Sequence, residues 1–301
     1  MTKLLGVGDS HIKLLESVIP AKITIRGQII KIKGNEKDIN KTKQIFFEML
    51  ETLNSKGSLR SIDVQNIINL IYSKGELSLN KDGRDLIIHY GNNGAIFPKT
   101  PGQKDYFEKV KNNDIVFSIG PAGTGKTFLA VTFAVSSLEN DEVDRIVLCR
   151  PAVEAGESLG FLPGDLKDKV DPYLAPLYDS LNVLYEKNKL KYLLESKTIE
   201  IAPLAYMRGR TLDRAYIILD EAQNTTSMQM KMFLTRLGVS SKAIVTGDIT
   251  QIDLKKNIES GLTHITQKLK NIKGIGFIKL EKADIIRHPL VMKIIEAYDN
   301  K

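Results

Sequence analysis

The chain has 301 residues, of which 42% are hydrophobic and 26% charged, a composition typical of a soluble globular protein. Its length suffices for one large or two modest domains. It contains no run of eighteen apolar residues, and Met1 to Pro20 lacks the unbroken apolar core of a signal peptide, so we expect no membrane span. The single cysteine, Cys149, cannot form an intrachain disulfide, and we expect a cytoplasmic location.

The positive charge is concentrated near the N-terminus. The net charge is +7; residues 1–100 hold 15 Lys/Arg and 10 Asp/Glu, whereas the remainder holds 28 and 26. Such an excess often marks only a solvated surface, but it also attracts the phosphates of nucleic acid. Charge alone leaves both interpretations open.

The first predicted elements form a small basic α/β unit. Apolar periodicity indicates a short helix that ends at Pro20, and alternation indicates two short strands joined near Gly27. Helical spacing then extends from Glu36 to Gly57 and resumes over 61–72.

A linker is predicted over residues 74–102, which are dense in glycine, asparagine and proline. These residues favour turns over a long regular element. We therefore place a domain boundary near residue 95, which divides the chain into domains 1–95 and 96–301.

The second domain alternates short β-rich runs with helical segments. Strands are predicted at 115–119, 145–148, 198–201, 216–219, 243–246 and 275–280, and helices at 103–111, 126–138, 166–195, 227–237 and 257–270. Such alternation predicts an α/β fold with a doubly wound, mostly parallel sheet.

A phosphate-binding loop is predicted between the first of these strands and its helix. The segment fits G-x-x-x-x-G-K-[ST] in full: Gly120-Pro121-Ala122-Gly123-Thr124-Gly125-Lys126-Thr127. Its glycines let backbone N–H groups turn toward phosphate oxygens, and the helix N-terminus adds partial positive charge. We expect Lys126 to reach the β- and γ-phosphates of ATP and the Thr127 hydroxyl to bind Mg²⁺.

Two acidic residues follow the apolar run 216–219, at the end of a predicted strand. Asp220 is expected to hold the Mg²⁺ shell, and Glu221 to polarise the attacking water. An adjacent pair of acids favours hydrolysis over transfer to a small acceptor. The alternative is a strand that ends in acidic turn residues.

A third polar segment, Gly247-Asp248-Ile249-Thr250-Gln251, follows the strand predicted at 243–246. Beside the Asp220 strand, Asp248 or Gln251 would sense the γ-phosphate. Gly-Asp is also a common turn, so the motif is weak by itself.

The order of these three motifs resembles that of motifs I, II and III in superfamily 1 helicases. Longer stretches resemble the PhoH-like family, densely over residues 97–298; they are 120–127, 150–157, 159–166, 202–211, 220–225 and 287–291. This resemblance implies a P-loop NTPase (RecA-like) ATPase core, with links to RNA metabolism. It also implies that Gln103, 17 residues before Gly120, stands where superfamily 1 helicases read adenine. An ordinary helix-surface glutamine is the alternative.

Family resemblance further suggests a K-homology-like RNA-binding unit at the N-terminus. Such a unit clamps the nucleic-acid backbone with a G-x-x-G loop. Within residues 1–95 the spacing occurs only at Gly91–Gly94, past the predicted helices and in the linker. Whether residues 1–95 bind RNA therefore stays open.

Three arginines between the ATP motifs are candidates for nucleic-acid contacts: Arg150, Arg208 and Arg210. The corresponding regions of superfamily 1 helicases touch single-stranded nucleic acid, and arginine suits phosphates and stacked bases. Alternatively, Arg150 and Arg208 pair with Glu154 or Glu157 to pin the loops. A subunit contact is a third interpretation.

Arg287 is the candidate for the arginine that neutralises transition-state charge, because the match to helicase motif VI falls there. The residues after the linker suffice for one helicase core domain, not two. An arginine supplied across a subunit interface would complete the site, so we expect a homo-oligomer, such as a ring. A salt-bridged surface arginine is the alternative. The four histidines are scattered and give no zinc-site pattern.

These features predict a Mg²⁺-dependent ATPase that acts on single-stranded RNA by remodelling or unwinding it. Two other functions stay open: a small-molecule phosphotransferase that uses ATP, and a nucleotide-switched adaptor with slow turnover.

Overall fold

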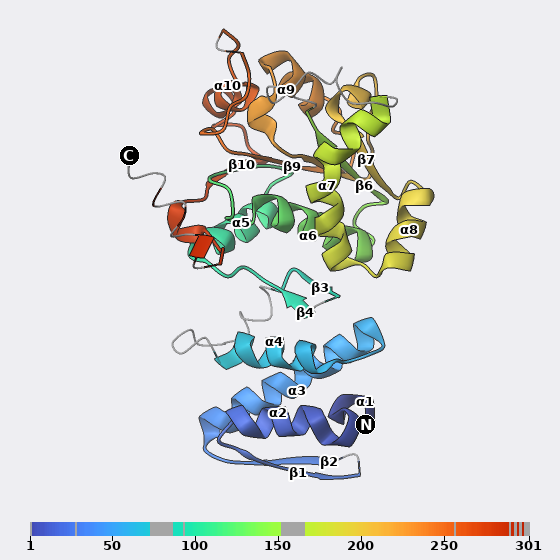
Figure 1. The fold of residues 1–301 in the computed structure, drawn as a ribbon, viewed down its shortest axis with the longest axis vertical. Helices are drawn as coiled ribbons and strands as arrows, with labels where there is room; N and C mark the ends of the chain where they lie inside the picture. The colour runs from blue at the N-terminus through green and yellow to red at the C-terminus, as the bar shows by residue number, and fades with distance from the viewer. Residues whose placement is uncertain are drawn as a thin grey trace. The chain divides into compact units, whose positions relative to one another are not determined.

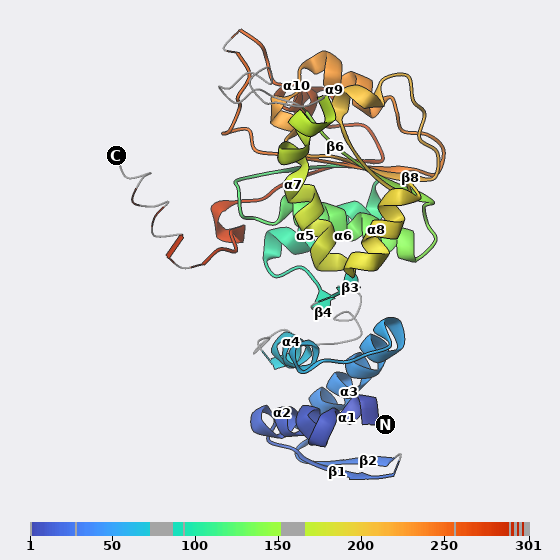
Figure 2. The same cartoon turned by 45° about the vertical axis from the view of Figure 1, so that its right-hand side comes forward.

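The structure, a computed structural model, describes residues 2–27, 29–72, 87–92, 94–151, 166–255 and 257–288, with residues 290, 291, 294 and 297. The chain divides into two compact units, Met1–Phe97 and Pro98–Lys301. This division lies close to the boundary predicted near residue 95. Figures 1 and 2 show the elements of each unit from two sides. Among the described residues, no helix is long and apolar enough to span a membrane.

The first unit packs helices against an antiparallel hairpin. Its elements are α1 Thr2–Leu5, η1 Val7–Asp9, α2 Ser10–Val18, β1 Lys22–Arg26, β2 Ile29–Lys33, α3 Glu36–Lys56, α4 Ser61–Tyr72, β3 His89–Gly91 and β4 Gly94–Ile96. In the β1–β2 hairpin, Ile23 lies opposite Ile32 and contributes to a core with Leu15 and Met49. Alternate residues such as Thr24 are exposed, as a strand with one buried face requires. The predicted helices and strands of this unit are confirmed.

The ends of α3 follow from local chemistry. The Asn35 side chain accepts a hydrogen bond from Asp38 N at 2.8 Å, which satisfies one free N–H of the first turn. Gly57 ends the helix in the left-handed region at φ 68°, which favours glycine.

The predicted linker contains a second hairpin. Strands β3 and β4 pair antiparallel, with Gly91 opposite Gly94, and the Tyr90 hydroxyl donates to Glu48 of α3 at 2.5 Å. The G-x-x-G spacing at Gly91–Gly94 is therefore that of a β-hairpin turn. Residues 74–86 of the predicted linker lie outside the described residues.

The second unit is built on a six-stranded sheet in which every neighbouring pair is parallel. Its strands are β5 Ile115–Ile119, β6 Arg145–Arg150, β7 Ile199–Pro203, β8 Ala215–Leu219, β9 Lys242–Gly247 and β10 Ile275–Lys279. Their order is β10-β5-β9-β8-β6-β7. The doubly wound parallel sheet, and with it the predicted P-loop NTPase fold, is confirmed.

Helices cover both faces of this sheet, which is why its central strands are mostly apolar. They are α5 Pro101–Asn112, α6 Lys126–Glu139, α7 Leu166–Leu184, α8 Lys187–Glu195, α9 Ser227–Leu234 and α10 Gly261–Lys268, with the short 3₁₀ segments η4 Leu204–Met207, η5 Ala222–Asn224 and η6 Lys282–Asp284. Helices α9 and α10 pack on one face, and α5 and α6 lie on the other (Figures 1 and 2).

One helix prediction was wrong: residues 166–195 form two helices, α7 and α8, rather than one. The break falls at Tyr185 and Glu186, where Glu186 adopts an extended backbone. No proline or glycine marks the break, so the helical periodicity did not reveal it.

The strand order positions the site. Strand β9 lies between β5, which leads into the phosphate loop, and β8, which leads into the acidic pair. Because parallel strands end at the same edge, the loops after β5, β8 and β9 meet there. Open α/β sheets bind their ligands at this edge.

Candidate functional site

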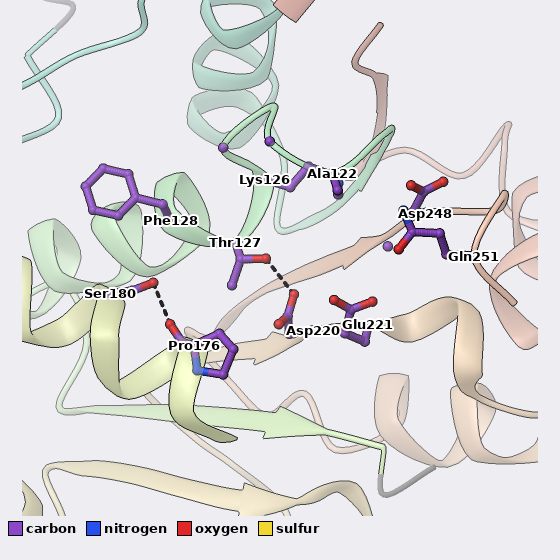
Figure 3. Close-up of a pocket in the computed structure, with 13 residues that line it drawn as sticks. Ala122, Lys126, Thr127, Phe128, Pro176, Ser180, Asp220, Glu221, Asp248 and Gln251 are labelled. Carbon is purple, nitrogen blue, oxygen red and sulfur yellow. Dashed lines mark hydrogen bonds between the residues drawn. The ribbon is translucent and has the colours of Figure 1, made fainter. Parts of the chain in front are cut away.

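The phosphate loop surrounds a cavity of about 290 Å³ at the carboxyl edge of the sheet (Figure 3). Gly123 and Gly125 adopt φ values of 86° and 82°, a left-handed backbone conformation that residues with a Cβ rarely adopt. The cavity is lined by Ala122, Gly123, Gly125, Lys126, Thr127, Phe128, Pro176, Ser180, Asp220, Glu221, Gly247, Asp248 and Gln251. The three sequence motifs therefore share one cavity, and α7 contributes part of its wall.

Asp220 joins the phosphate loop to the acidic strand. Its Oδ1 accepts hydrogen bonds from Thr127 Oγ1 at 2.7 Å and from Thr246 Oγ1 at 2.6 Å. The first is drawn as a dashed line in Figure 3. Asp220 is 3% exposed. A carboxylate and a hydroxyl in contact are oxygen donors of the kind that Mg²⁺ prefers.

These oxygen donors fit a Mg²⁺ ion whose remaining coordination positions are filled by nucleotide phosphates. Among the described residues, no group of three or more His, Cys, Asp or Glu side chains is arranged to hold a metal ion by itself. Mg²⁺ characteristically takes one or two carboxylates together with substrate phosphates and waters. Thr127 and Asp220 would supply the protein's part of that shell.

Glu221 lies beside Asp220 in a left-handed backbone conformation, with φ 54° and ψ 39°. Such a conformation is uncommon for a residue with a side chain, and it is often found at functional sites. Its carboxylate forms an ion pair with Arg150 Nη2 at 2.8 Å and accepts a hydrogen bond from Gln223 Nε2 at 2.5 Å. Gln223 in turn accepts from Asp248 N at 3.0 Å, which links the acidic pair to the loop after β9.

Asp248 is buried, and its two oxygens differ. Oδ1 accepts hydrogen bonds from Thr250 N and Oγ1, at 2.9 and 2.7 Å. Oδ2 is buried and has no hydrogen-bond partner within the described part of the chain. A buried polar atom without a partner is costly, so this oxygen fits a site that a bound group completes. Gln251 lines the same cavity.

Lys126 donates from Nζ to Pro121 O, within its own loop, at 2.8 Å. Burial lowers the pKa of its ammonium, and the neighbouring carboxylates, chiefly Asp248, partly offset that lowering. A bound phosphate would supply the same kind of compensating negative charge.

Gln103 is buried at the start of α5, with 4% of its surface exposed. Its Nε2 donates to Thr124 O in the phosphate loop at 2.9 Å, and its Oε1 accepts from Lys99 N at 2.8 Å. Gln103 is thus not an ordinary surface glutamine; in this structure its amide holds the loop. The adenine-reading role stays a prediction.

Arg287 lies against the phosphate loop of its own chain. Ile286 N donates to Gly123 O at 2.9 Å, and a Cβ at Gly123 would overlap the Arg287 side chain. Our sequence argument for supply across a subunit interface assumed that a single core domain has no such arginine near its own loop. Since Arg287 does lie there, that argument for an oligomer loses its basis.

Asp284 anchors the segment that carries Arg287. Its carboxylate accepts hydrogen bonds from Thr100 Oγ1 and Gly102 N at the start of α5, at 2.5 and 3.0 Å, and from Glu281 N at 2.9 Å. Burial raises the pKa of Asp284, but these three hydrogen bonds outweigh burial and hold it below its ordinary value.

The three arginine candidates lie in different surroundings. Arg150 pairs with Glu221, so it belongs to the ATP site; Glu154 and Glu157, its suggested partners, lie outside the described residues. Arg210 forms a bidentate pair with Glu200 of β7, both contacts being 2.7 Å, and this pair pins a loop. Arg208 is exposed after η4, and Tyr206, within η4, is 53% exposed.

Three residues whose hydrogen bonds support the site were not among our predictions: Thr246, Gln223 and Asp284. The hydroxyl of Thr246 interrupts an apolar strand immediately before Gly247-Asp248, and this pattern could have identified Thr246 as a site residue. Gln223 follows Glu221 by two residues, but its link to Asp248 depends on the neighbouring strands. Nothing in the sequence pairs Asp284 with Thr100, 184 residues away.

Comparison with known proteins agrees with the family resemblance of the sequence motifs. The family model described as PhoH-like protein matches residues 95–299. A PhoH-like protein of Bacillus subtilis is 50% identical, covering 99% of this chain and 93% of its own, and Protein PhoH of Escherichia coli is 38% identical, covering 78% and 65%. The solved structure of Pif1 helicase from Candida albicans is 14% identical with a TM-score of 0.38, covering 68% of this chain and 44% of that one. On the family match and the curated relatives, this chain belongs to the PhoH-like protein family.

Proposed function

We propose that this protein is a Mg²⁺-dependent ATPase whose turnover is coupled to single-stranded RNA. The observation that carries the ATPase is the 2.7 Å hydrogen bond between Thr127 and Asp220, which joins the phosphate loop to the acidic strand. When bound between these residues and the phosphates, Mg²⁺ would neutralise the charge that develops in phosphoryl transfer.

Side chains and backbone groups of the protein bind the phosphates and activate the attacking water. Lys126 binds the β- and γ-phosphates, and the loop N–H groups hold the phosphate oxygens. Glu221 orients and polarises the attacking water. Asp248 and Gln251, at the end of the strand between the loop and the acids, respond to the γ-phosphate.

Arg287 acts in cis in this proposal, because it lies against Gly123 of its own chain. Arg287→Ala is expected to keep ATP binding and to lose turnover. Mixing it with Lys126→Ala protein separates the two models: a cis arginine gives no recovery of turnover, whereas recovery in the mixture requires a subunit interface. A ring or other homo-oligomer remains a proposal that this experiment addresses.

RNA coupling is supported by exposed cationic and aromatic side chains. Tyr206 and Arg208 are both exposed after β7. An aromatic ring stacks on a base, and arginine binds phosphate. The exposed face of the β1–β2 hairpin adds the basic residues Lys22, Lys31 and Lys33 in the first unit.

The direct test is phosphate release from ATP, measured with and without single-stranded RNA over a salt series. We expect stimulation by RNA that weakens steeply with salt, because binding through phosphates releases counterions. Turnover that RNA does not change at any salt would contradict the coupling. A phosphorylated small-molecule product in place of free phosphate would identify a phosphotransferase instead.

A further inference from the structure

Arg150 joins three separate parts of the second unit. It ends β6, and its Nη2 contacts Glu221 Oε1 at 2.8 Å, while its Nε lies 3.9 Å from Asp220 Oδ2. Its Nη1 donates to Tyr173 O of α7 at 2.6 Å. The planar guanidinium has a fixed fork of donors that reaches these groups in several directions at once. Arg150 thus ties the proposed water-activating carboxylate to a helix of the cavity wall.

Glu221 is held from its other side as well. Gln223 Nε2 donates to Glu221 Oε2, and Gln223 is itself 1% exposed and fixed by Asp248 N. One carboxylate oxygen of Glu221 therefore accepts a hydrogen bond, and the other is paired with the Arg150 guanidinium. The backbone of Glu221 is left-handed, at φ 54°.

This arrangement restrains the chemistry proposed for Glu221. A carboxylate that polarises water must direct a free lone pair toward that water. The hydrogen bond from Gln223 occupies one lone pair of Oε2, and the ion pair with Arg150 holds Oε1 toward the guanidinium and offsets part of the negative charge that would polarise water. Removal of the Arg150 contact would release Oε1 from the guanidinium while Gln223 keeps the side chain in place.

We propose that Arg150 is a positioning residue that holds Glu221 in a low-activity arrangement, and that a phosphate of single-stranded RNA draws Arg150 away. The release step rests on the proposed function. Arg150 lies at the carboxyl end of a parallel strand, where such sheets bind ligands, and its side chain is 19% exposed. A phosphate competes for the guanidinium because it accepts two parallel hydrogen bonds.

The test compares Arg150→Gln and Arg150→Lys with the parent chain in ATP turnover without RNA. Lysine keeps the charge but has no fork to engage Tyr173 O and Glu221 together. We expect kcat to rise about fivefold in both variants with KM for ATP unchanged, the effect of losing one ion pair. Stimulation by poly(U) should fall to near one in both. A change confined to kcat separates this role from a general loss of structure.

Two controls sharpen the result. Arg214→Gln removes an exposed ion pair with Asp144, 2.9 Å long and remote from the acidic pair, and should leave turnover and its stimulation as in the parent. The double variant Arg150→Gln/Glu221→Gln should show no gain, because the gain passes through Glu221. Thermal melting verifies that each variant is folded, and Arg150→Lys carries the test if the glutamine variant is not.

The outcomes separate this inference from the proposed function. A kcat that is unchanged or lowered in both folded variants, with the parent still stimulated by RNA, overturns the inference alone. If basal turnover rises in the variants but RNA does not stimulate the parent, the restraint of Glu221 by Arg150 is supported. The same result overturns the release of Arg150 by RNA and, with it, the proposed RNA coupling. A gain that persists in the double variant also overturns the inference.

Discussion

The phosphate loop has two sides that differ in how their polar groups are satisfied. On the catalytic side, Asp248 leaves a buried oxygen without a partner in the described chain, and Lys126 donates to Pro121 O within its own loop. On the other side, Gln103 and Asp284 are buried with their polar ends bonded, and the segment of Asp284 contacts the loop through Ile286.

This difference distinguishes residues that take part in catalysis from residues that hold the loop in its conformation. Groups that meet a substrate must keep capacity for new bonds, whereas groups that set the loop's shape are best fully bonded before the substrate arrives. Substitutions on the catalytic side should therefore act on turnover. Those on the supporting side should act on affinity and stability.

The largest effect is expected for Lys126→Ala on the catalytic side. Without its ammonium, the phosphates lose their cationic partner, and turnover should fall about a hundredfold to a thousandfold, as for other preorganised donors. Phosphate release at saturating ATP measures it. Turnover within a few-fold of the parent would show that the loop's N–H groups suffice.

A smaller effect is expected for Gln103→Ala on the supporting side. Thr124 O and Lys99 N would both lose a buried partner, and ATP affinity should weaken about tenfold because the loop is no longer held. Turnover at saturating ATP should change less than affinity does. Binding of a fluorescent ATP analogue, set beside kcat, measures the two.

The matched control is Gln229→Ala. This glutamine also bonds a backbone N–H, that of Thr226 at 2.9 Å, but it caps α9 far from the loop in sequence. It should lower stability by about 1 kcal/mol and leave ATP affinity unchanged. Equal losses of affinity in both variants would remove the distinction between the two sides.

The smallest effect is the pH dependence that Asp284 gives to stability. Its folded-state pKa is lowered, so its contribution is complete above the unfolded pKa of about 3.9 and is lost as pH falls through the folded value. Asp284→Asn should be less stable than the parent by about 1 kcal/mol near neutrality, and the gap should narrow below about pH 4. Urea unfolding across pH 3–7 measures it; a gap independent of pH would contradict the assignment.

Much of the fold could be predicted because short apolar runs between turn residues specify buried parallel strands. All six strands of the second unit lie within a residue or two of their predicted positions. The break between α7 and α8 lacks a proline or glycine signal. The β3–β4 hairpin was missed because its strands are only three residues long, within a glycine-rich segment.

The site was predictable where a motif carries its own geometry, as in the phosphate loop and the acidic pair. Contacts that depend on strand order were not. The bond from Thr246 to Asp220 exists because β9 lies beside β8, and the Arg150–Glu221 pair because β6 lies on the other side of β8. Spacing along the chain does not specify which strands are neighbours.

The central claim, ATP hydrolysis that depends on Glu221, is tested most directly by single-turnover phosphate release from Mg²⁺-ATP. Glu221→Gln should bind ATP as tightly as the parent and release phosphate about 10²- to 10⁴-fold more slowly, because it cannot polarise the water. Glu200→Gln is the matched control, since this carboxylate is also paired with an arginine but lies on β7; it should hydrolyse at the parent's rate. Phosphate release by Glu221→Gln at the parent's rate would contradict the account.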